Sequence, residues 1–132
     1  MLAESLVPSA ARTDGIDVHA LSHVTGGGLV ANLARVLPPT VFARLDRSTW
    51  TPQPVFDVVR RVGDVSQADL EATLNCGVGM VALTPPEDID TAIEVLAGHG
   101  IRAWVAGEVT ADTSATGDLG GRVNLIGQHP GW

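Results

Sequence analysis

The 132-residue sequence predicts a single α+β domain, in which helices pack on a mixed β-sheet. Short apolar runs bounded by glycine or proline alternate with segments of helical periodicity, which indicates strands and helices in alternation. The last two apolar runs have only a polar segment between them, so we expect an antiparallel hairpin there. With 45% hydrophobic residues, the chain can form one core. We expect this domain at residues 16–127, between an irregular leading segment at 1–15 and a tail at 128–132.

The first half of the domain is expected to begin with a strand. Gly15 and Gly26 bound the first apolar run, which is too short for a helix. Leucines and a valine on one stripe predict the next helix, which a pair of prolines ends. Pro54 suits the first turn of a later helix, because its fixed φ is already helical. The expected elements are a strand at 16–24, a turn at 25–28, a helix at 29–37, a strand at 40–45 and a helix at 54–61.

The second half is expected to open with a helix that Ser66 caps, because Asp69 stands three residues later, as in a capping box. Thr84 and Glu87 have the same spacing and predict a second capped helix. The expected elements are a helix from 66 to about 75, a strand at 78–83, a helix from 84–87 to 98–100, a strand at 101–109, a polar loop or hairpin at 110–121 and a strand at 122–126.

The charged residues exclude several kinds of chemistry. All eight basic residues are arginine, so no lysine can serve as a P-loop ligand, a Schiff base or a general base within this chain. The net charge of −7 argues against a nucleic-acid or anionic-membrane partner. One cysteine excludes an internal disulfide and favours a reducing compartment. The sequence has no apolar run long enough to span a membrane and no basic region typical of a signal peptide. We therefore expect a cytoplasmic protein.

A glycine run is the strongest local feature. His23 and Thr25 precede three glycines at 26–28, and a predicted helix follows directly. Glycines permit unusual backbone conformations, and a helix start offers unpaired N–H groups with a positive dipole end, so the segment could hold a phosphate group. It is not a P-loop, because the lysine is missing. The alternative is a strand-to-helix turn in which the glycines only relieve crowding.

Four polar residues near this run raise further hypotheses. On one strand, His19 and His23 would lie about 13 Å apart, too far to share a metal ion. We therefore expect no metal site, a structural role for His19 and a polar role for His23. Asn32 and Arg35 share one flank of the following helix, where they either reach a substrate or form a solvated face.

A second glycine turn, at 75–79, joins a helix to a strand. Asn75 tolerates left-handed backbone and bonds to neighbouring amides, which explains it as a turn residue. Cys76 has no base in the sequence pattern that would activate it as a nucleophile. We expect a small buried side chain there.

Four motifs in order resemble the carboxy-terminal domain of phosphoribosylformylglycinamidine cyclo-ligase, the aminoimidazole ribonucleotide synthetase of purine biosynthesis. The motifs are the run 17–29 with its continuation to 38, the group Trp50, Pro52, Pro54 and Phe56, the run 73–80, and the group Trp104, Gly107 and Val109. The resemblance covers residues 17–109, and the order of four separate motifs makes it specific.

The resemblance implies an ATP- and Mg²⁺-dependent ring closure of formylglycinamidine ribonucleotide. It also implies a separate amino-terminal domain, which forms a dimer and supplies much of the ATP site across a cleft. The surface that this domain would cover is expected to be exposed, which allows a homo-oligomer. No residue receives a catalytic role, and the residues expected to bind substrate or phosphate are His23, Thr25, Gly26, Gly27, Gly28, Asn32, Arg35, Asn75 and Gly77.

Two departures from the family pattern bear on activity. The sequence has no amino-terminal domain, and segment 7–12 leads almost directly to Asp17, so part of the first element is expected to be deleted. We therefore expect the chain to be inactive alone. It is either the carboxy-terminal half of a split enzyme or a truncated remnant or interaction module without turnover. A nucleotide- or metal-binding regulator outside purine synthesis is a third alternative.

Overall fold

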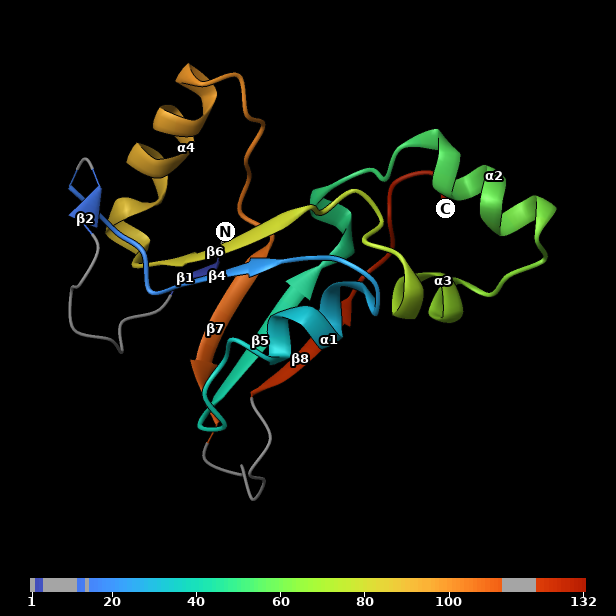
Figure 1. Cartoon of the computed structure of the whole chain (residues 1–132), viewed down its shortest axis with the longest axis horizontal. Helices are drawn as coiled ribbons and strands as arrows, with labels where there is room; N and C mark the ends of the chain where they lie inside the picture. The colour runs from blue at the N-terminus through green and yellow to red at the C-terminus, as the bar shows by residue number, and fades with distance from the viewer. Residues whose placement is uncertain (1, 4–11, 14, 113–120) are drawn as a thin grey trace.

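Figure 1 shows the computed structural model of the chain, which describes residues 2–3, 12–13, 15–112 and 121–132. Within them the predicted α+β class is confirmed, because mixed sheets carry helices packed on them. The elements are, in order, β1 (Leu2–Ala3), β2 (Arg12–Thr13), β3 (Ile16–Asp17), β4 (Ala20–His23), α1 (Gly28–Ala34), β5 (Val41–Asp46), the 3-10 helix η1 (Arg47–Thr49), α2 (Pro54–Val62), α3 (Gln67–Thr73), β6 (Met80–Thr84), the 3-10 helix η2 (Pro86–Asp88), α4 (Ile89–Gly98), β7 (Gly107–Ala111) and β8 (Arg122–Ile126).

Two three-stranded sheets form the body of the domain. In the first, β6 lies between β1 and β4, parallel to β1 and antiparallel to β4. In the second, β5 lies between β7 and β8, antiparallel to β7 and parallel to β8. The predicted hairpin of the last two strands is therefore wrong, because β5 separates them. The central place suits β5, since its inward side chains Val41, Ala43 and Leu45 are fully buried.

The main hydrophobic core joins α1 to both sheets through Leu33 of α1, Leu45 of β5 and Leu83 of β6. A smaller cluster around Ile16 and Ala92 attaches α4 to the first sheet. α1 also contacts α3 and β8, whereas α2 lies at the opposite end of the molecule from α4 (Figure 1). None of the helices within the described ranges is long and apolar enough to cross a bilayer.

One of the two predicted helix caps is confirmed. Ser66 caps α3, because its Oγ accepts a hydrogen bond from the Asp69 N–H at 3.1 Å and donates to the Asp69 carboxylate at 2.7 Å. The cap at Thr84 is wrong, since Thr84 is the fully buried last residue of β6 and pairs with Ala3 of β1. Pro86 then begins η2, which leads into α4 without a side-chain cap.

Two predicted strands differ in extent. The strand expected at 16–24 is divided into β3 and β4, and the strand expected at 101–109 begins only at Gly107. A Cβ at Gly107 would lie 2.0 Å from the Arg44 carbonyl oxygen, so the pairing of β7 with β5 begins where a glycine permits the close approach. Most of the loop expected at 110–121 lies outside the described residues.

Candidate functional site

The two glycine turns lie side by side at one edge of the first sheet. β4 and β6 are antiparallel, so the end of β4 faces the start of β6, and His23 pairs with Met80. Directly beyond this pair, the Val24 N–H donates to the Gly79 carbonyl oxygen at 3.0 Å. Two segments about 50 residues apart, which sequence analysis identified separately, therefore form one surface.

Asn32 holds the first turn together from inside. Its side-chain amide donates to the carbonyl oxygens of Gly28 at 2.7 Å and of Thr25 and Gly26 at 3.3 Å. The Asn32 side-chain oxygen accepts from the Thr25 hydroxyl at 3.4 Å and from the Arg35 guanidinium at 3.5 Å. Asn32 is buried and Arg35 exposed, so the two residues that sequence analysis placed on one flank have different environments.

Replacing Asn32 with leucine is expected to lower the free energy of unfolding by about 1–3 kcal/mol, because the buried turn loses its amide donor while the side-chain size is kept. Urea unfolding followed by circular dichroism measures the loss. Ala31→Leu, at an exposed position of the same helix, is the matched control and should change stability little. Equal losses in both variants would contradict the role of the amide.

The three glycines of this turn differ in backbone conformation, in surroundings and in exposure. Gly27 and Gly28 have φ of +98° and +75°, in the left-handed region. A Cβ at Gly28 would also lie 1.9 Å from the Glu71 carbonyl oxygen, whereas one at Gly26 would meet nothing within 4 Å. Gly26 and Gly27 are exposed, and their N–H groups form no hydrogen bond within the described residues. The turn thus has two adjacent exposed glycines whose amides are unpaired within the described residues, at the start of α1.

The second turn is held by one of its own side chains and by side chains from the segment before α2. The Asn75 side-chain oxygen accepts from the Gly77 N–H at 3.0 Å, which closes an Asx turn as sequence analysis expected. The Trp50 indole donates to the Cys76 carbonyl oxygen at 3.1 Å. Gly77 has φ of +94°, and a Cβ there would lie 2.7 Å from the Gln53 side-chain oxygen. The segment before α2 therefore packs against this turn and donates one hydrogen bond to it.

Cys76 is buried, and burial raises the pKa of its thiol to about 11, with the nearby Glu71 carboxylate adding to the shift. At pH 8 only about one thiol in a thousand would be ionised. We therefore expect iodoacetamide to alkylate the native protein at least about 100-fold more slowly than the protein in urea, as mass spectrometry can follow. Rapid labelling of the native protein would contradict this inert role.

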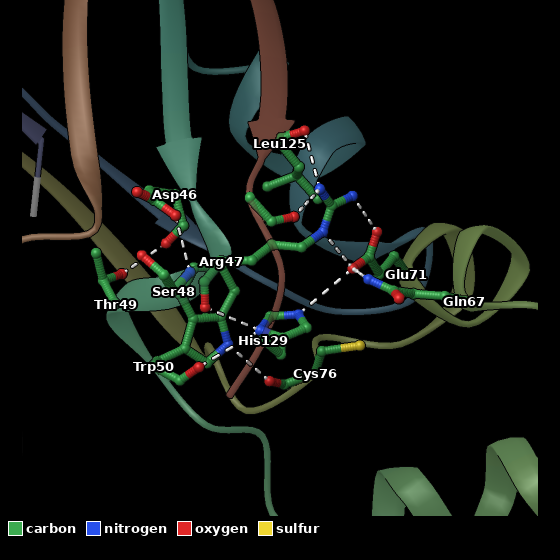
Figure 2. Close-up of polar contacts among 11 residues, drawn as sticks. Asp46, Arg47, Ser48, Thr49, Trp50, Gln67, Glu71, Cys76, Leu125 and His129 are labelled. Carbon is green, nitrogen blue, oxygen red and sulfur yellow. Dashed lines mark hydrogen bonds and ion pairs between the residues drawn. The ribbon is translucent and has the colours of Figure 1, made fainter. Parts of the chain in front are cut away.

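A buried ionic cluster behind the second turn was missed by sequence analysis (Figure 2). Arg47 donates to both carboxylate oxygens of Glu71, from Nε and Nη2, each at 2.7 Å. Its Nη1 donates to the Leu125 carbonyl oxygen of β8 at 3.0 Å. Gln67 adds a hydrogen bond to Glu71 at 2.9 Å, and His129 Nε2 lies 3.4 Å from the same carboxylate. The cluster connects η1, α3, β8 and the residues after it.

Burial alone would raise the pKa of Glu71, but the hydrogen bonds from Arg47 and Gln67 outweigh it, so the pKa lies below its ordinary value. The carboxylate is therefore charged and fully paired. His129, in the segment expected to be a tail, is almost fully buried between the rings of Trp50 and Trp132. No local pattern signals this cluster, since the chain has fifteen acidic residues and the partner of Glu71 lies 24 positions away.

An apolar groove of about 480 Å³ begins at the second turn. Leu21 of β4 and Met80 of β6 line its floor, and Leu96, Ile101 and Trp104 line its walls. Since residues paired across antiparallel strands point to the same face, His23 lies on the groove side of the sheet, next to Met80. The volume lies within the range typical of small-molecule sites.

Across the described residues, no three histidine, cysteine, aspartate or glutamate side chains lie close enough together to hold an ion. His19 Nε2 lies 3.3 Å from an Asp17 carboxylate oxygen, whereas His23 is exposed. The two histidines therefore have separate environments.

Comparison with known sequences identifies the family. Residues 5–120 match the family described as AIR synthase related protein, C-terminal domain. The chain belongs to this family. The resemblance based on the four motifs is thus confirmed, and both glycine turns and the wall residues of the groove fall within the matched AIR synthase region.

Relatives of this AIR synthase domain support the same assignment. The phosphoribosylformylglycinamidine cyclo-ligase of Nitrosococcus oceani is 46% identical over 99 residues, which are 75% of this chain and 28% of that enzyme. The cyclo-ligase of Symbiobacterium thermophilum is 45% identical over 95 residues, 72% of this chain and 27% of that enzyme. A Streptomyces fradiae protein provisionally given the same name is 49% identical over 119 residues, 90% of this chain and 65% of that protein. The chain therefore spans less than two thirds of each of these relatives.

Proposed function

We propose that this chain supplies the carboxy-terminal half of a phosphoribosylformylglycinamidine cyclo-ligase, which closes the imidazole ring of a purine precursor in the cytoplasm. One observation carries the proposal: the two family turns meet at one sheet edge, where exposed backbone amides adjoin an apolar groove. Relatives that bear the cyclo-ligase name extend well beyond the length of this chain. The remainder of the active site therefore belongs to an amino-terminal part.

The residues at this edge suit a phosphorylated substrate. The exposed N–H groups of Gly26 and Gly27 can donate to phosphate oxygens, and no acidic residue in the first turn of α1 opposes the negative charge. Thr25 lies beside them, and Arg35 adds a positive charge behind the turn. Asn32 shapes the turn, and His23 stands between it and the groove. Asn75 and Gly77 shape the opposite border.

When bound, ATP with Mg²⁺ would supply a phosphoryl group to the formyl amide oxygen and leave as ADP, so that attack by the amidine nitrogen on the formyl carbon could release that oxygen as phosphate. We assign to the present chain the binding and orientation of the substrate. It offers no cluster of three ligands for magnesium among the described residues and, throughout its sequence, no lysine. We assign metal binding to the amino-terminal part.

The test is an assay of ATP hydrolysis coupled to ring closure, with the chain alone and mixed with the part of the Nitrosococcus oceani enzyme that it does not match. We expect no turnover by the chain alone and turnover in the mixture. Turnover by the chain alone would contradict the proposal that an amino-terminal part completes the active site. Failure of the mixture would instead favour a non-catalytic interaction module.

A paired substitution tests the phosphate site within that mixture. A side chain at Gly26 meets nothing within 4 Å, so both Gly26→Asp and Gly26→Ala should leave the fold intact. We expect Gly26→Asp to raise KM for the ribonucleotide about ten-fold or more, because its carboxylate repels phosphate, and Gly26→Ala to change KM little. The same KM in both variants would overturn the assignment.

A further inference from the structure

The last six residues, 127–132, lie against the domain, and we call them the strap. Arg47 Nη1 donates to the Gly127 carbonyl oxygen at 3.3 Å, at the start of the strap. The Trp132 N–H donates to the His129 carbonyl oxygen at 3.1 Å, and the Trp132 ring lies 5.5 Å from the Arg60 guanidinium of α2 (Figure 1). The matched family region ends at residue 120, so the match assigns no role to these contacts.

His129 anchors the strap inside the domain (Figure 2). Its side chain is 1% exposed, and its ring stands nearly perpendicular to two indoles, with centroids 4.7 Å from Trp50 and 4.9 Å from Trp132. Its Nδ1 lies 3.1 Å from the Arg47 carbonyl oxygen and 3.4 Å from the Trp50 carbonyl oxygen. Because carbonyl oxygens only accept, Nδ1 carries a proton and donates it. His129 therefore contacts Trp50 at both its backbone and its ring.

Trp50 connects the strap to both parts of the candidate site. Its indole N–H donates to the Cys76 carbonyl oxygen of the second turn at 3.1 Å (Figure 2). Its ring centroid lies 6.3 Å from that of Trp104, which lines the groove. Trp50 is only 4% exposed, so the close packing of its neighbours decides how its ring is oriented. A neighbour that fixes this ring thus acts on the second turn and on the groove wall together.

We propose that His129 is a positioning residue for the substrate site, because its ring keeps the Trp50 indole aimed at the second turn. Truncation of His129 to alanine opens a cavity beside the indole, which frees the ring to turn away from the Cys76 carbonyl oxygen. The second turn then loses its hydrogen bond to the segment before α2. The effect on substrate binding rests on the proposed function, whereas the positioning of Trp50 is measurable on this chain alone.

Substitution can separate the two contacts of His129. Phenylalanine keeps a ring between the two indoles but has no N–H for the carbonyl oxygens of Arg47 and Trp50, and alanine removes both contacts. Both variants lose a buried hydrogen bond and are less stable, but only alanine releases the Trp50 ring. Ile16→Ala is the remote control, because Ile16 lies in the smaller hydrophobic cluster, apart from Trp50.

Hydrogen exchange of the full chain, followed by NMR, tests the positioning. The Trp50 indole N–H and the Gly77 N–H report on the second turn, and the amides of β5 report on the core. We expect His129→Ala to raise the first two exchange rates at least about ten-fold more than those of β5. His129→Phe and Ile16→Ala should raise all of these rates by similar factors. An even increase in His129→Ala, or the same selective increase in His129→Phe, would overturn positioning by the ring.

A milder variant keeps the test decisive if His129→Ala does not fold. Trp132 is half-buried and supports the far side of the His129 ring. Trp132→Ala should therefore give the same selective exchange at the Trp50 indole and at Gly77, with a smaller increase of about three-fold. Even exchange across the chain in this variant would also contradict the positioning role.

Steady-state kinetics of the mixture with the amino-terminal part test the consequence for the substrate. We expect His129→Ala to raise KM for the ribonucleotide at least about five-fold and to change kcat by less than about two-fold, because the second turn borders the binding site. His129→Phe should restore KM, and Ile16→Ala should leave it unchanged. Selective exchange with an unchanged KM would overturn the role in substrate binding. Absence of turnover in every mixture would contradict the proposed function, while the exchange pattern would still decide whether His129 positions Trp50.

Discussion

Replacing Gly28 with alanine is expected to lower the free energy of unfolding by about 2–5 kcal/mol, a large part of the 5–15 kcal/mol typical of a domain. A Cβ at this position would lie 1.9 Å from the Glu71 carbonyl oxygen and 3.0 Å from the Glu71 carbonyl carbon. Both are backbone atoms of α3, so no side-chain rotation can relieve the clash, and overpacking of this kind costs about 1–3 kcal/mol. The φ of +75° adds about 1–2 kcal/mol for a residue with a Cβ.

The neighbouring glycines provide graded controls for this variant. Gly27→Ala has the strained φ but no close contact, and Gly26→Ala has neither. Urea unfolding of the three variants should therefore rank Gly28→Ala as the least stable, Gly27→Ala as intermediate and Gly26→Ala as close to the unmodified chain. If Gly27→Ala and Gly28→Ala were equally destabilised, the contact between α1 and α3 would not be the reason for glycine at position 28.

The order of these effects explains why a run of three glycines occurs here. Gly28 permits α1 to approach α3, Gly27 provides the left-handed N-cap, and Gly26 leaves the rim of the turn open. The structural and the phosphate-binding hypotheses for this run therefore apply to different residues. Gly28 serves packing, whereas the open position at Gly26 belongs to the proposed phosphate site.

Features with local causes were predictable from the sequence. Ser66 and Asp69 form the expected cap because both partners lie within one turn of the chain. The last strand, at 122–126, has the expected bounds, and the second turn is closed by Asn75 as expected. The family resemblance succeeded for another reason, because it depended on four motifs in order rather than on any single element.

Features that depend on distant parts of the chain were not predictable. The place of β5 between β7 and β8 depends on strands about 65 to 80 residues further along the chain. Thr84 has the local pattern of a helix cap, but pairing with β1 places it inside a sheet instead. Glu71 resembles an ordinary solvated acid until Arg47 and His129 are brought against it. The substrate-binding roles of the turn residues remain predictions that the variants above test.

Replacing Arg47 with methionine is expected to lower the free energy of unfolding at pH 7 by about 3–5 kcal/mol, because it leaves the Glu71 carboxylate buried without its partner. The side chains of Arg47 and Glu71 are only 17% and 8% exposed, so water cannot replace the lost hydrogen bonds. The variant also loses the hydrogen bond from Arg47 to β8. Urea unfolding at pH 7 measures the effect.

Arg44→Met is the matched control, since it removes an arginine that pairs with Glu108 at a surface where both side chains are 53% exposed. Exposed ion pairs contribute about 0–1 kcal/mol, so this variant should remain close to the unmodified chain. The double variant Arg47→Met/Glu71→Leu should recover part of the stability, because it removes the unpaired charge together with its partner. Equal losses in Arg44→Met and Arg47→Met would show that the buried pair has no special role.

The pH dependence separates an unpaired charge from a simple loss of packing. In the unmodified chain the pKa of Glu71 is below its ordinary value of 4.5, so its contribution is present above about pH 4.5 and is lost as the pH falls through the folded pKa. In Arg47→Met the hydrogen bonds from Arg47 are lost and no longer outweigh the effect of burial. The pKa of Glu71 should therefore rise above its value in the unfolded chain. The variant then regains stability as Glu71 takes up a proton. Its deficit relative to the unmodified chain should therefore shrink between pH 7 and pH 5, whereas a deficit caused by packing alone would stay constant.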